Sequence, residues 1–502
     1  MRTFIISALF IVSGILGFCC QMLYANYFGS GKEMDIYFAL FSIPAIITGA
    51  TGTIFSSLFF PAFARLGDTP DLDEYIYTVK RHVSRIALII AAIGFSVTYF
   101  NLSRIIDSDN PHFLDLALIL SILFWLNSYI SIVAGYLASV QNYFKNFLVV
   151  SFSQLLVYFS IIIFVVAFHE SLGVSSIAAG LLTASIIQLL INRFYGGIFH
   201  KSSSKANVEA INLISNIFLI VISFMPFHAF ASISYLWAGN LNDSGSVALL
   251  GYSHSFCGFL STATSMGIAT VSFPDLARSL SSSDTDVLHN GFINFRNQLE
   301  VVVIFASFVA IFTSLFAHPI IEVLFMRGQF DINAVNGLSR VLPIYLINGV
   351  FISMMNLIRN VYYSLNKQRK FAYFSSAVTL VFVLSSIILS TKVDYFVIGI
   401  VEVLSMGLFV FISLCGINSF DRVFNYKYML KLIGQFVVLF LSGFCVYMLY
   451  EVHLFSEGKI VSVVVGGLIY SLLVDAMLST LIKNPIVLAI NLKIMSLLKK
   501  II

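Results

Sequence analysis

The chain has 502 residues, of which 59% are hydrophobic and only 10% are charged, and its mean hydropathy is +0.95. A water-soluble core of this length could not hide so much apolar surface, so the composition excludes the soluble globular classes. The formal net charge of +4 is then read as membrane topology, and no nucleic-acid partner is expected.

Long apolar windows, separated by short polar loops, follow one another along almost the whole chain. A hydrocarbon core roughly 30 Å thick needs about 20 apolar residues per spanning helix, and the windows reach that length. We therefore predict an all-α polytopic membrane protein with about 14 transmembrane helices. The windows lie near 3–28, 34–60, 83–100, 113–140, 146–168, 172–192, 210–238, 246–273, 300–317, 335–365, 370–390, 395–417, 431–450 and 460–483.

The basic residues predict the orientation of these helices. If the number of spans is even and the N-terminus lies inside, 21 of the 28 Lys and Arg fall on inner loops and flanks. Cytoplasmic loops carry such an excess, so both termini are expected in the cytoplasm. The tail from Pro485 to Ile502 has the spacing of an amphipathic helix on the inner leaflet.

A long internal repeat is visible at the ends of two windows. Phe60–Arg65 closes the second window, and the similar run Phe273–Arg278 closes the eighth. Ser30-Gly31 and Ser244-Gly245 recur just before the same two windows. The matching positions Pro61, Arg65, Pro274 and Arg278 are our candidate repeat or hinge residues.

Six helices separate the two copies, so both halves would enter the membrane the same way round. This arrangement predicts two parallel six-helix lobes with a substrate cleft between them. We assign residues 1–205 to the first lobe and 206–420 to the second. Residues 421–502 then hold two additional C-terminal helices and the tail.

Several short runs are similar to those of a known family. The runs are Ser13–Phe18, Phe28–Gly31, Asp35, Pro44, Phe60-Pro61, Gly245–Val247, Tyr252, Phe273-Pro274, Leu324-Phe325 and Tyr363-Ser364. The order of these runs along residues 1–380 resembles that of the MurJ (MviN) lipid II flippases, which are members of the MOP exporter superfamily.

The resemblance implies a function and a set of partners. A central cavity would take the headgroup of a polyprenyl-pyrophosphate-linked saccharide, lipid II or a related peptidoglycan precursor, and move it from the inner to the outer leaflet by alternating access. Membrane lipids, and proteins of cell-wall or polysaccharide synthesis, are the other partners it implies. It implies a multi-pass protein of the bacterial cytoplasmic (inner) membrane that is not an enzyme and has no cofactor.

The chain departs from the family pattern at several cationic cavity positions, where uncharged residues stand. An anion that leaves water needs compensating donors or charges, so either other groups supply them or the cargo differs from lipid II. A flippase for another lipid-linked oligosaccharide, of the O-antigen or capsule type, is thus an alternative, and a MATE-like exporter is another. The uncharged residues at these cationic positions are Gly14, Cys20, Thr48, Gly49 and Ser255, and Gln21 stands where the family has an Asp after its Arg.

Ionisable groups inside the windows are functional candidates because their insertion into lipid is costly. Asp35, His254 and Arg359 are the candidates for the substrate cavity. Asp35 fits either a gate or the dipole of its own helix start, and Arg359 fits either anion binding or a side chain that extends to the interface. His254 is read either as a packing residue or as a phosphate donor or proton carrier.

Two further acidic groups, Glu402 and Asp475, also fall within windows, and Asp475 could be a neutral, protonated acid. The five cysteines lie in apolar windows without the spacing of a zinc site, so no metal is expected.

Overall fold

The computed structural model is helical throughout the part of the chain that it describes. No strand occurs within that part, and turns connect the helices. The predicted all-α class is confirmed. The described residues are 2–49, 70–102, 110–195, 229–239, 245–280, 284–389, 394–417, 426–451 and 459–480, with the single residues 55, 59, 63, 226 and 282.

The chain divides into two compact units. Unit 1 comprises Met1–Ser255, Arg327–Ala334 and Gln368–Phe409, and unit 2 comprises Phe256–Met326, Val335–Lys367 and Val410–Ile502. Unit 1 thus contains residues from both predicted lobes, whose boundaries stay a prediction.

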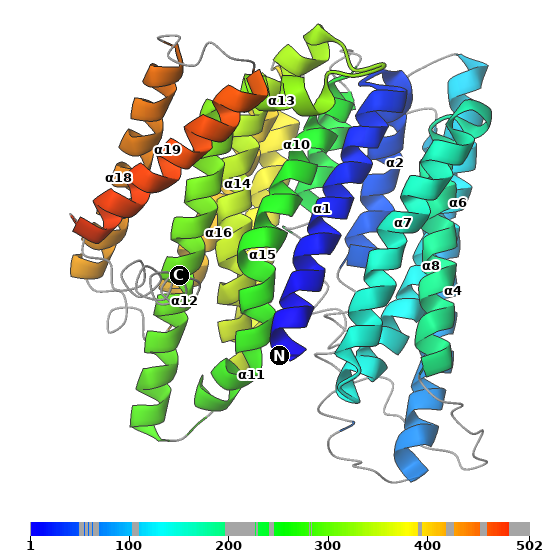
Figure 1. The fold of residues 1–502 in the computed structure, drawn as a ribbon. Helices are drawn as coiled ribbons and strands as arrows, with labels where there is room; N and C mark the ends of the chain where they lie inside the picture. The colour runs from blue at the N-terminus through cyan, green and yellow to red at the C-terminus, as the bar shows by residue number, and fades with distance from the viewer. Residues whose placement is uncertain are drawn as a thin grey trace, which may run out of the picture. The chain divides into compact units, whose positions relative to one another are not determined.

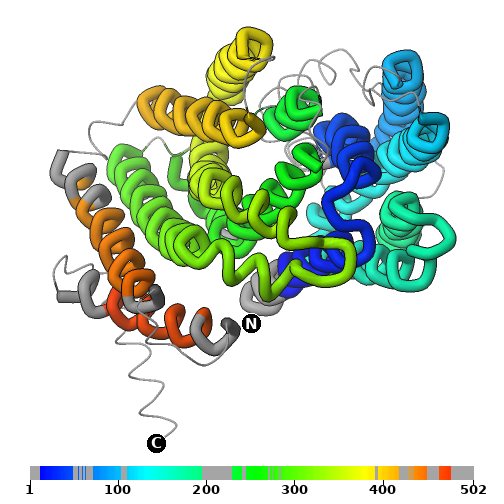
Figure 2. The backbone as a smooth tube through the Cα atoms, turned by 90° about the horizontal axis from the view of Figure 1, so that it is seen from above, coloured from blue at the N-terminus to red at the C-terminus, as the bar shows by residue number. Residues whose placement is uncertain are grey.

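Unit 1 is built on long helices that pack along their length. Helix α7 lies between α1 and α8, while α6 contacts α2, α4 and α8, and Figures 1 and 2 show α6, α7 and α8 side by side. The helices of unit 1 are α1 (Arg2–Phe28), α2 (Lys32–Gly49), α4 (Pro70–Phe100), α6 (Pro111–Tyr143), α7 (Phe147–Leu172), α8 (Ser175–Tyr195), α15 (Gln368–Leu389), most of α16 (Tyr395–Cys415) and the first part of α10 (Ser246–Ser261).

Unit 2 begins within α10 and includes the C-terminal helices. Helix α12 contacts α11 and α18, and α18 lies against α19, as Figure 1 shows. After α10 follow the π-helical turn η1 (Thr262–Met266), α11 (Gly267–Leu280), α12 (Thr285–Leu315), α13 (Ala317–Phe325), most of α14 (Ile332–Ser364), α18 (Tyr426–Glu451) and α19 (Lys459–Thr480).

Local sequence explains where these helices begin and end. Pro111 opens α6, and Asn110 before it accepts a hydrogen bond from the His112 backbone N–H at 3.1 Å. Asp284 caps α12 in the same way, and Gly173 ends α7 with a φ of 53°.

Eight of the described helices are long and apolar enough to cross a membrane. On α4, the exposed apolar side chains Leu88, Ile89, Ile93, Val97 and Phe100 form one stripe, as expected for a face turned to lipid. The protein is therefore a multi-pass membrane protein.

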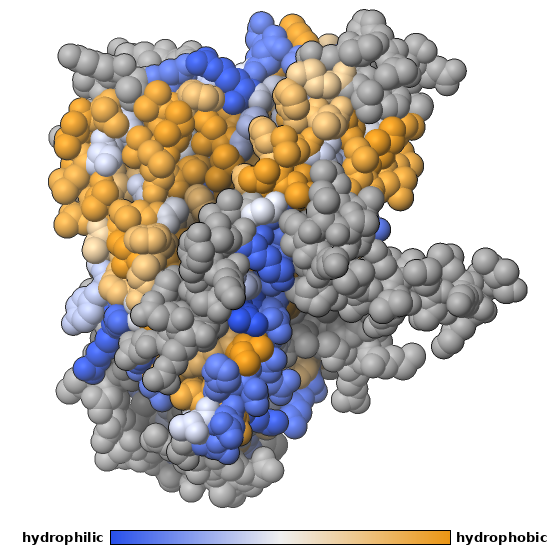
Figure 3. Space-filling view, turned by 90° about the vertical axis from the view of Figure 1, so that its left-hand side faces the viewer, coloured by the Kyte–Doolittle hydropathy of each residue, from blue (hydrophilic) through white to orange (hydrophobic). Residues whose placement is uncertain are grey.

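Two helices extend beyond the predicted apolar windows. Helix α4 begins at Pro70 rather than near 83, and α12 begins at Thr285 rather than near 300. The first turns of both helices are rich in polar residues. A hydropathy window therefore covers only the apolar part of each helix and misses its polar start. Figure 3 shows a face on which apolar side chains gather above hydrophilic ones, and α12 has the same division along its length.

Helices α4, α6 and α8 form a tight group in unit 1, which we call the α4–α6–α8 bundle. Gly94 lets α4 approach Trp125 of α6 so closely that a Cβ atom on Gly94 would lie 2.1 Å from the indole ring. The Trp125 Nε1–H donates to Thr98 Oγ1 at 3.1 Å, and the Tyr136 hydroxyl donates to the Ile76 carbonyl at 2.9 Å. Small residues at such contacts permit the close approach that joins helices in lipid.

Candidate functional site

Asp35 joins two helices that are far apart in the sequence. Its carboxylate, on the first turns of α2, accepts hydrogen bonds from the backbone N–H groups of Gly245 and Ala248, both at 2.7 Å. These N–H groups belong to the start of α10, where a helix has no internal acceptors and a negative charge is favourable. Gly245 has no side chain for this role, so Asp35 supplies the cap from another helix.

Two further hydrogen bonds lie beside this cap. The Tyr252 hydroxyl of α10 donates to the carbonyl of Gly29 at 2.7 Å, at the end of α1. The backbone N–H of Gln329 donates to the carbonyl of Asn26 at 3.0 Å. We call these contacts of Asp35, Tyr252 and Gln329, all within unit 1, the Asp35 latch.

Glycines make the close approach at the latch possible. Gly29, Gly245 and Gly328 all have positive φ, at 66°, 95° and 56°. A Cβ on Gly245 would lie 2.5 Å from the Ser30 carbonyl oxygen, and one on Gly328 would lie 2.1 Å from the Asn26 carbonyl oxygen. Any other residue at these positions would both strain the backbone and push the segments apart.

His254 and Glu402 form a second polar cluster in unit 1. The His254 Nε2 atom lies 2.8 Å from Glu402 Oε1, and the Ser234 hydroxyl donates to Glu402 Oε2 at 2.7 Å. The Glu402 side chain is 2% exposed and that of His254 15%. The structure therefore brings a cavity candidate and a membrane-charge candidate together, and it adds Ser234, which has no signal of its own in the sequence.

Arg359 lies in unit 2 on α14 and is 6% exposed, so its side chain lies among neighbouring residues rather than along the surface. The same helix carries amides that bind across to the η1 and α11 region. Asn356 donates to Ser265 Oγ at 3.0 Å, and Asn360 donates to the Ala269 carbonyl at 2.9 Å. The role of Arg359 in anion binding stays a prediction.

The remaining candidates are dispersed. Asp475 is half-buried on α19, Pro274 lies within α11, and Arg278 is exposed near the end of α11. Pro61, Arg65 and the tail after Thr480 lie outside the described residues.

The uncharged residues at the family's cationic positions use their polar groups locally. The Cys20 thiol points to the Tyr158 carbonyl at 3.8 Å, while Thr48 and Ser255 donate to carbonyls of their own helices, those of Pro44 and Gly251. None of these side chains replaces a positive charge.

One buried ion pair was missed by the sequence reasoning. Glu300 of α12 accepts from Lys431 at 2.5 Å and from Gln435 at 2.8 Å, both on α18. Glu300 stands at the first residue of a predicted window and Lys431 at the start of another, so each was read as an end of a span. Their pairing ties the C-terminal helices to α12 within unit 2.

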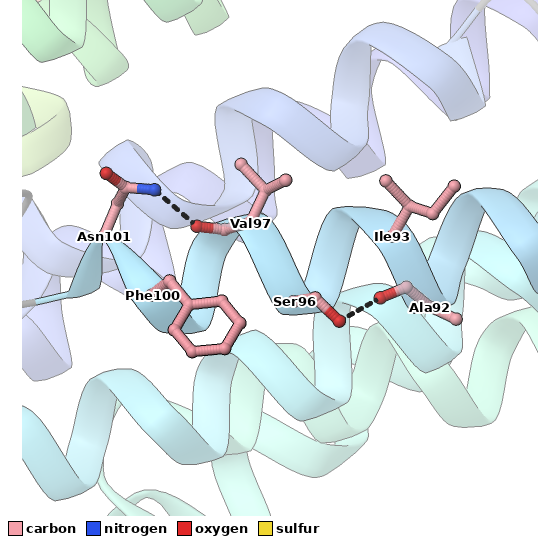
Figure 4. A pocket seen from close by; sticks show the side chains of 6 residues that line it. All are labelled: Ala92, Ile93, Ser96, Val97, Phe100 and Asn101. Carbon is pink, nitrogen blue, oxygen red and sulfur yellow. Dashed lines mark hydrogen bonds between the residues drawn. The ribbon is translucent and has the colours of Figure 1, made fainter.

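A shallow surface hollow at the end of α4 does not suit a polar ligand. Its volume is about 430 Å³, and residues of the α4 end line it, as Figure 4 shows. Its polar groups are used within the helix, since Ser96 donates to Ala92 and Asn101 donates to Val97. Within the described residues, no three His, Cys, Asp or Glu side chains are close enough to hold a metal ion.

Comparison with known sequences identifies the family. The sequence profile described as lipid II flippase MurJ matches residues 24–468. A protein of Borreliella burgdorferi named probable lipid II flippase MurJ is 21% identical over 479 residues, which cover 91% of this chain and 90% of that protein. The lipid II flippase MurJ of Burkholderia cenocepacia is 22% identical over 387 residues, or 72% of each chain.

Solved structures share the fold. A lipid II flippase MurJ in an inward closed conformation superposes with a TM-score of 0.77 at 19% identity, covering 95% of this chain and all of that one. An inward-facing MATE family multidrug transporter of the MOP superfamily has a TM-score of 0.63 at 13% identity and covers 83% of this chain. Because the family profile spans most of the sequence, the protein belongs to the lipid II flippase MurJ family.

Proposed function

We propose that the protein is a flippase that moves an undecaprenyl-pyrophosphate-linked saccharide, lipid II or a related peptidoglycan precursor, from the inner to the outer leaflet. The observation that carries this proposal is the family match over residues 24–468. The headgroup would cross in a polar cavity between the predicted lobes while the polyprenyl tail stays in lipid. An anion that moves outward across an inside-negative membrane gains roughly 2.3 kcal/mol per charge per 100 mV, so the membrane potential assists this direction.

The Asp35 latch supplies a gate for such a cycle. It joins the ends of α1 and α2 in the first predicted lobe to α10 in the second, at loops that we predict on the outer side. A few directional bonds can break and re-form without disturbing the helices themselves. We assign the latch to the state that is closed outward, and its release to the delivery of the headgroup.

A second cargo is favoured by the composition of the cavity positions. Cys20, Thr48 and Ser255 stand where the family carries cations, and their polar groups bind backbone carbonyls. A lipid-linked oligosaccharide of the O-antigen or capsule type would then be recognised more through its sugars than through its pyrophosphate. A MATE-like exporter shares the fold, but the family match favours the flippase.

Complementation tests the function. Cells depleted of their own lipid II flippase would receive this gene, and lipid II in the inner leaflet would be assayed directly. We expect growth to be restored and inner-leaflet lipid II to fall. Failure, with membrane insertion of the protein demonstrated, would favour the second cargo and contradict lipid II transport.

Arg359 can be tested in the same cells. We expect Arg359→Ala to lower transport without lowering the amount of protein in the membrane, because the buried cation would serve the pyrophosphate when the cavity opens. Arg340→Ala is the matched control, since Arg340 is exposed on the same helix. Equal transport by both variants would remove Arg359 from the cavity.

A further inference from the structure

The cluster of His254, Glu402 and Ser234 lies well inside the spanning helices. Glu402 is about 10 Å along α16 from its first residue, Tyr395, and His254 is about 12 Å along α10 from Ser246, at 1.5 Å per residue. A carboxylate at such a depth is unfavourable unless it is paired or neutralised, and in transport proteins such groups serve as proton carriers. The pair therefore requires an account beyond helix packing.

The geometry of the imidazole determines how many protons the closed cluster holds. His254 Nδ1 lies 3.0 Å from the carbonyl oxygen of Leu250, and Nε2 lies 2.8 Å from Glu402 Oε1. Both ring nitrogens thus face acceptor oxygens. A neutral imidazole has one N–H, so beside an ionised carboxylate one of its nitrogens would present a lone pair to an oxygen.

An additional proton removes this conflict in either of two positions. An imidazolium donates from both nitrogens, to Leu250 and to the carboxylate. Alternatively, a protonated Glu402 donates to Nε2 while Nδ1–H donates to Leu250. In both cases the second carboxylate oxygen accepts from Ser234, so one additional proton gives every polar contact of the cluster both a donor and an acceptor.

From this arrangement we propose that His254 and Glu402 form a proton-binding site, and that loading this site favours the state in which the Asp35 latch is closed. Release of the proton leaves one imidazole nitrogen with its lone pair facing an acceptor oxygen, which weakens the hydrogen bonding that joins α10 to α16. The ligand is the proton itself, which binds and leaves without any covalent step on the substrate. Among the described residues, Tyr235 also faces the pair, and its ring meets the imidazole edge-on with the ring centroids 5.2 Å apart.

Helix α10 connects the proton site to the latch. The two N–H groups that Asp35 binds are at the first turn of α10, and His254 lies on the same helix within unit 1. A ligand that binds one state better than the other shifts the equilibrium between them, and the effect is reciprocal. If the proton enters from the outer side after the headgroup has left, it drives the return to the latched state, and one pH unit across the membrane favours this step by up to about tenfold per proton.

The coupling of proton binding to transport rests on the proposed flippase function, whereas proton binding itself does not. Two experiments therefore test the two claims separately. Full-length protein would be titrated in lipid nanodiscs, with infrared difference spectra recording the protonated carboxyl group. We expect a carboxyl signal or an imidazolium signal that is lost in both Glu402→Gln and His254→Gln. Persistence of the full signal in both variants would overturn the proton site.

Coupling would then be measured in proteoliposomes that carry lipid II, with a pH-sensitive dye inside. We expect wild-type transport to rise severalfold when the outside is made acidic, with inward proton movement, and we expect Glu402→Gln to lose this response. Glu402→Asp should restore part of it. Glu170→Gln is the matched control, because Glu170 also neighbours a histidine, His169 at 4.0 Å, but is 91% exposed.

Each outcome addresses one of the two proposals. Wild-type transport that is equal with and without the pH difference would overturn coupling and leave the flippase intact. Absence of lipid II transport in the wild type would contradict the proposed function, while the infrared titration would still decide whether the protons bind. A Glu402→Gln variant that keeps the wild-type response to pH would overturn the site.

Discussion

The α4–α6–α8 bundle and the Asp35 latch both join helices of unit 1, but they do so with different chemistry. In the bundle, Trp125 closes over Gly94 and large side chains such as Tyr136 are fully buried. At the latch, the helix ends are held by backbone carbonyls and amides, one carboxylate and one hydroxyl.

This difference in chemistry distinguishes a contact between helices that stays closed from one that opens. Helices in lipid gain stability from close packing, and a gap of about 0.5 to 1 Å between the surfaces already removes a quarter to a half of this attraction. Hydrogen bonds at a helix end can exchange with water at little net cost, because each contributes only about 0.5 to 1.5 kcal/mol, or about 1.5 to 3 when a charge takes part. We therefore expect movement at the latch and rigidity in the bundle.

The largest expected effect comes from a cross-link. In a cysteine-free background, Asn26→Cys with Gln329→Cys, joined by a short bifunctional thiol reagent, should abolish transport, because these neighbouring residues would have to separate when the latch opens. The control is Ser131→Cys with Ser185→Cys, whose hydroxyl oxygens are 2.9 Å apart across α6 and α8. Transport assayed in proteoliposomes should survive the control cross-link; survival of both would show that the latch does not open.

The next effect is on stability. Gly94→Ala places a methyl group on the Trp125 ring and should destabilise the protein by about 1 to 3 kcal/mol through overpacking. The lower midpoint of thermal unfolding in detergent would report it. Gly258→Ala, on an exposed site with no atom within 4 Å, should instead raise the midpoint slightly. Equal midpoints for the two variants would contradict the tight contact.

Removal of the latch carboxylate has an intermediate effect. Asp35→Ala should destabilise the closed latch by about 2 kcal/mol, the upper end of the cost of removing the side chain that caps a helix start, and this shifts the equilibrium by roughly 30-fold. The labelling rate of a cysteine at position 26 with an impermeant thiol reagent measures the opening. Glu33→Ala, in the same first turn of α2, is the control and should label as slowly as the parent protein.

The smallest expected effects come from the same chemical change made in the latch and in the bundle. Tyr252→Phe and Tyr136→Phe each remove one hydroxyl that donates to a backbone carbonyl, at 2.7 Å and 2.9 Å, at a cost of about 1 kcal/mol. We expect Tyr252→Phe to raise the labelling rate at position 26 and Tyr136→Phe to lower the unfolding midpoint alone. If both variants changed the labelling rate at position 26 equally, the latch would not open independently of the bundle.

Most of the fold could be predicted from hydropathy, because lipid imposes one length on every spanning helix. The windows near 113–140, 146–168 and 395–417 correspond to α6, α7 and α16. The first turns of α4 and α12 could not be predicted in this way, since their polar residues continue the helix where no apolar window requires it.

The individual candidate residues were visible in the sequence, but their partners were not. Asp35 was recognised by its position on a helix start, yet the helix that it caps lies more than 200 residues away. His254 and Glu402 were each selected as an ionisable group in an apolar window, and only the contact between α10 and α16 brings them together. Ser234 is one of many serines, so its contact with Glu402 required the structure.

The π-helical turn at Thr262–Met266 sets how far the side chains of α11 are rotated about the helix axis relative to those of α10. Such a turn holds one residue more than a regular helix would, and each residue of an α-helix advances the side chains by about 100°. Deletion of a single residue there would turn every later residue, including Ala269, whose carbonyl accepts from Asn360, away from its present neighbours. In an alignment with relatives of this chain, a gap of one residue between positions 262 and 266 would therefore indicate a protein in which the side chains of these two helices are rotated differently relative to each other.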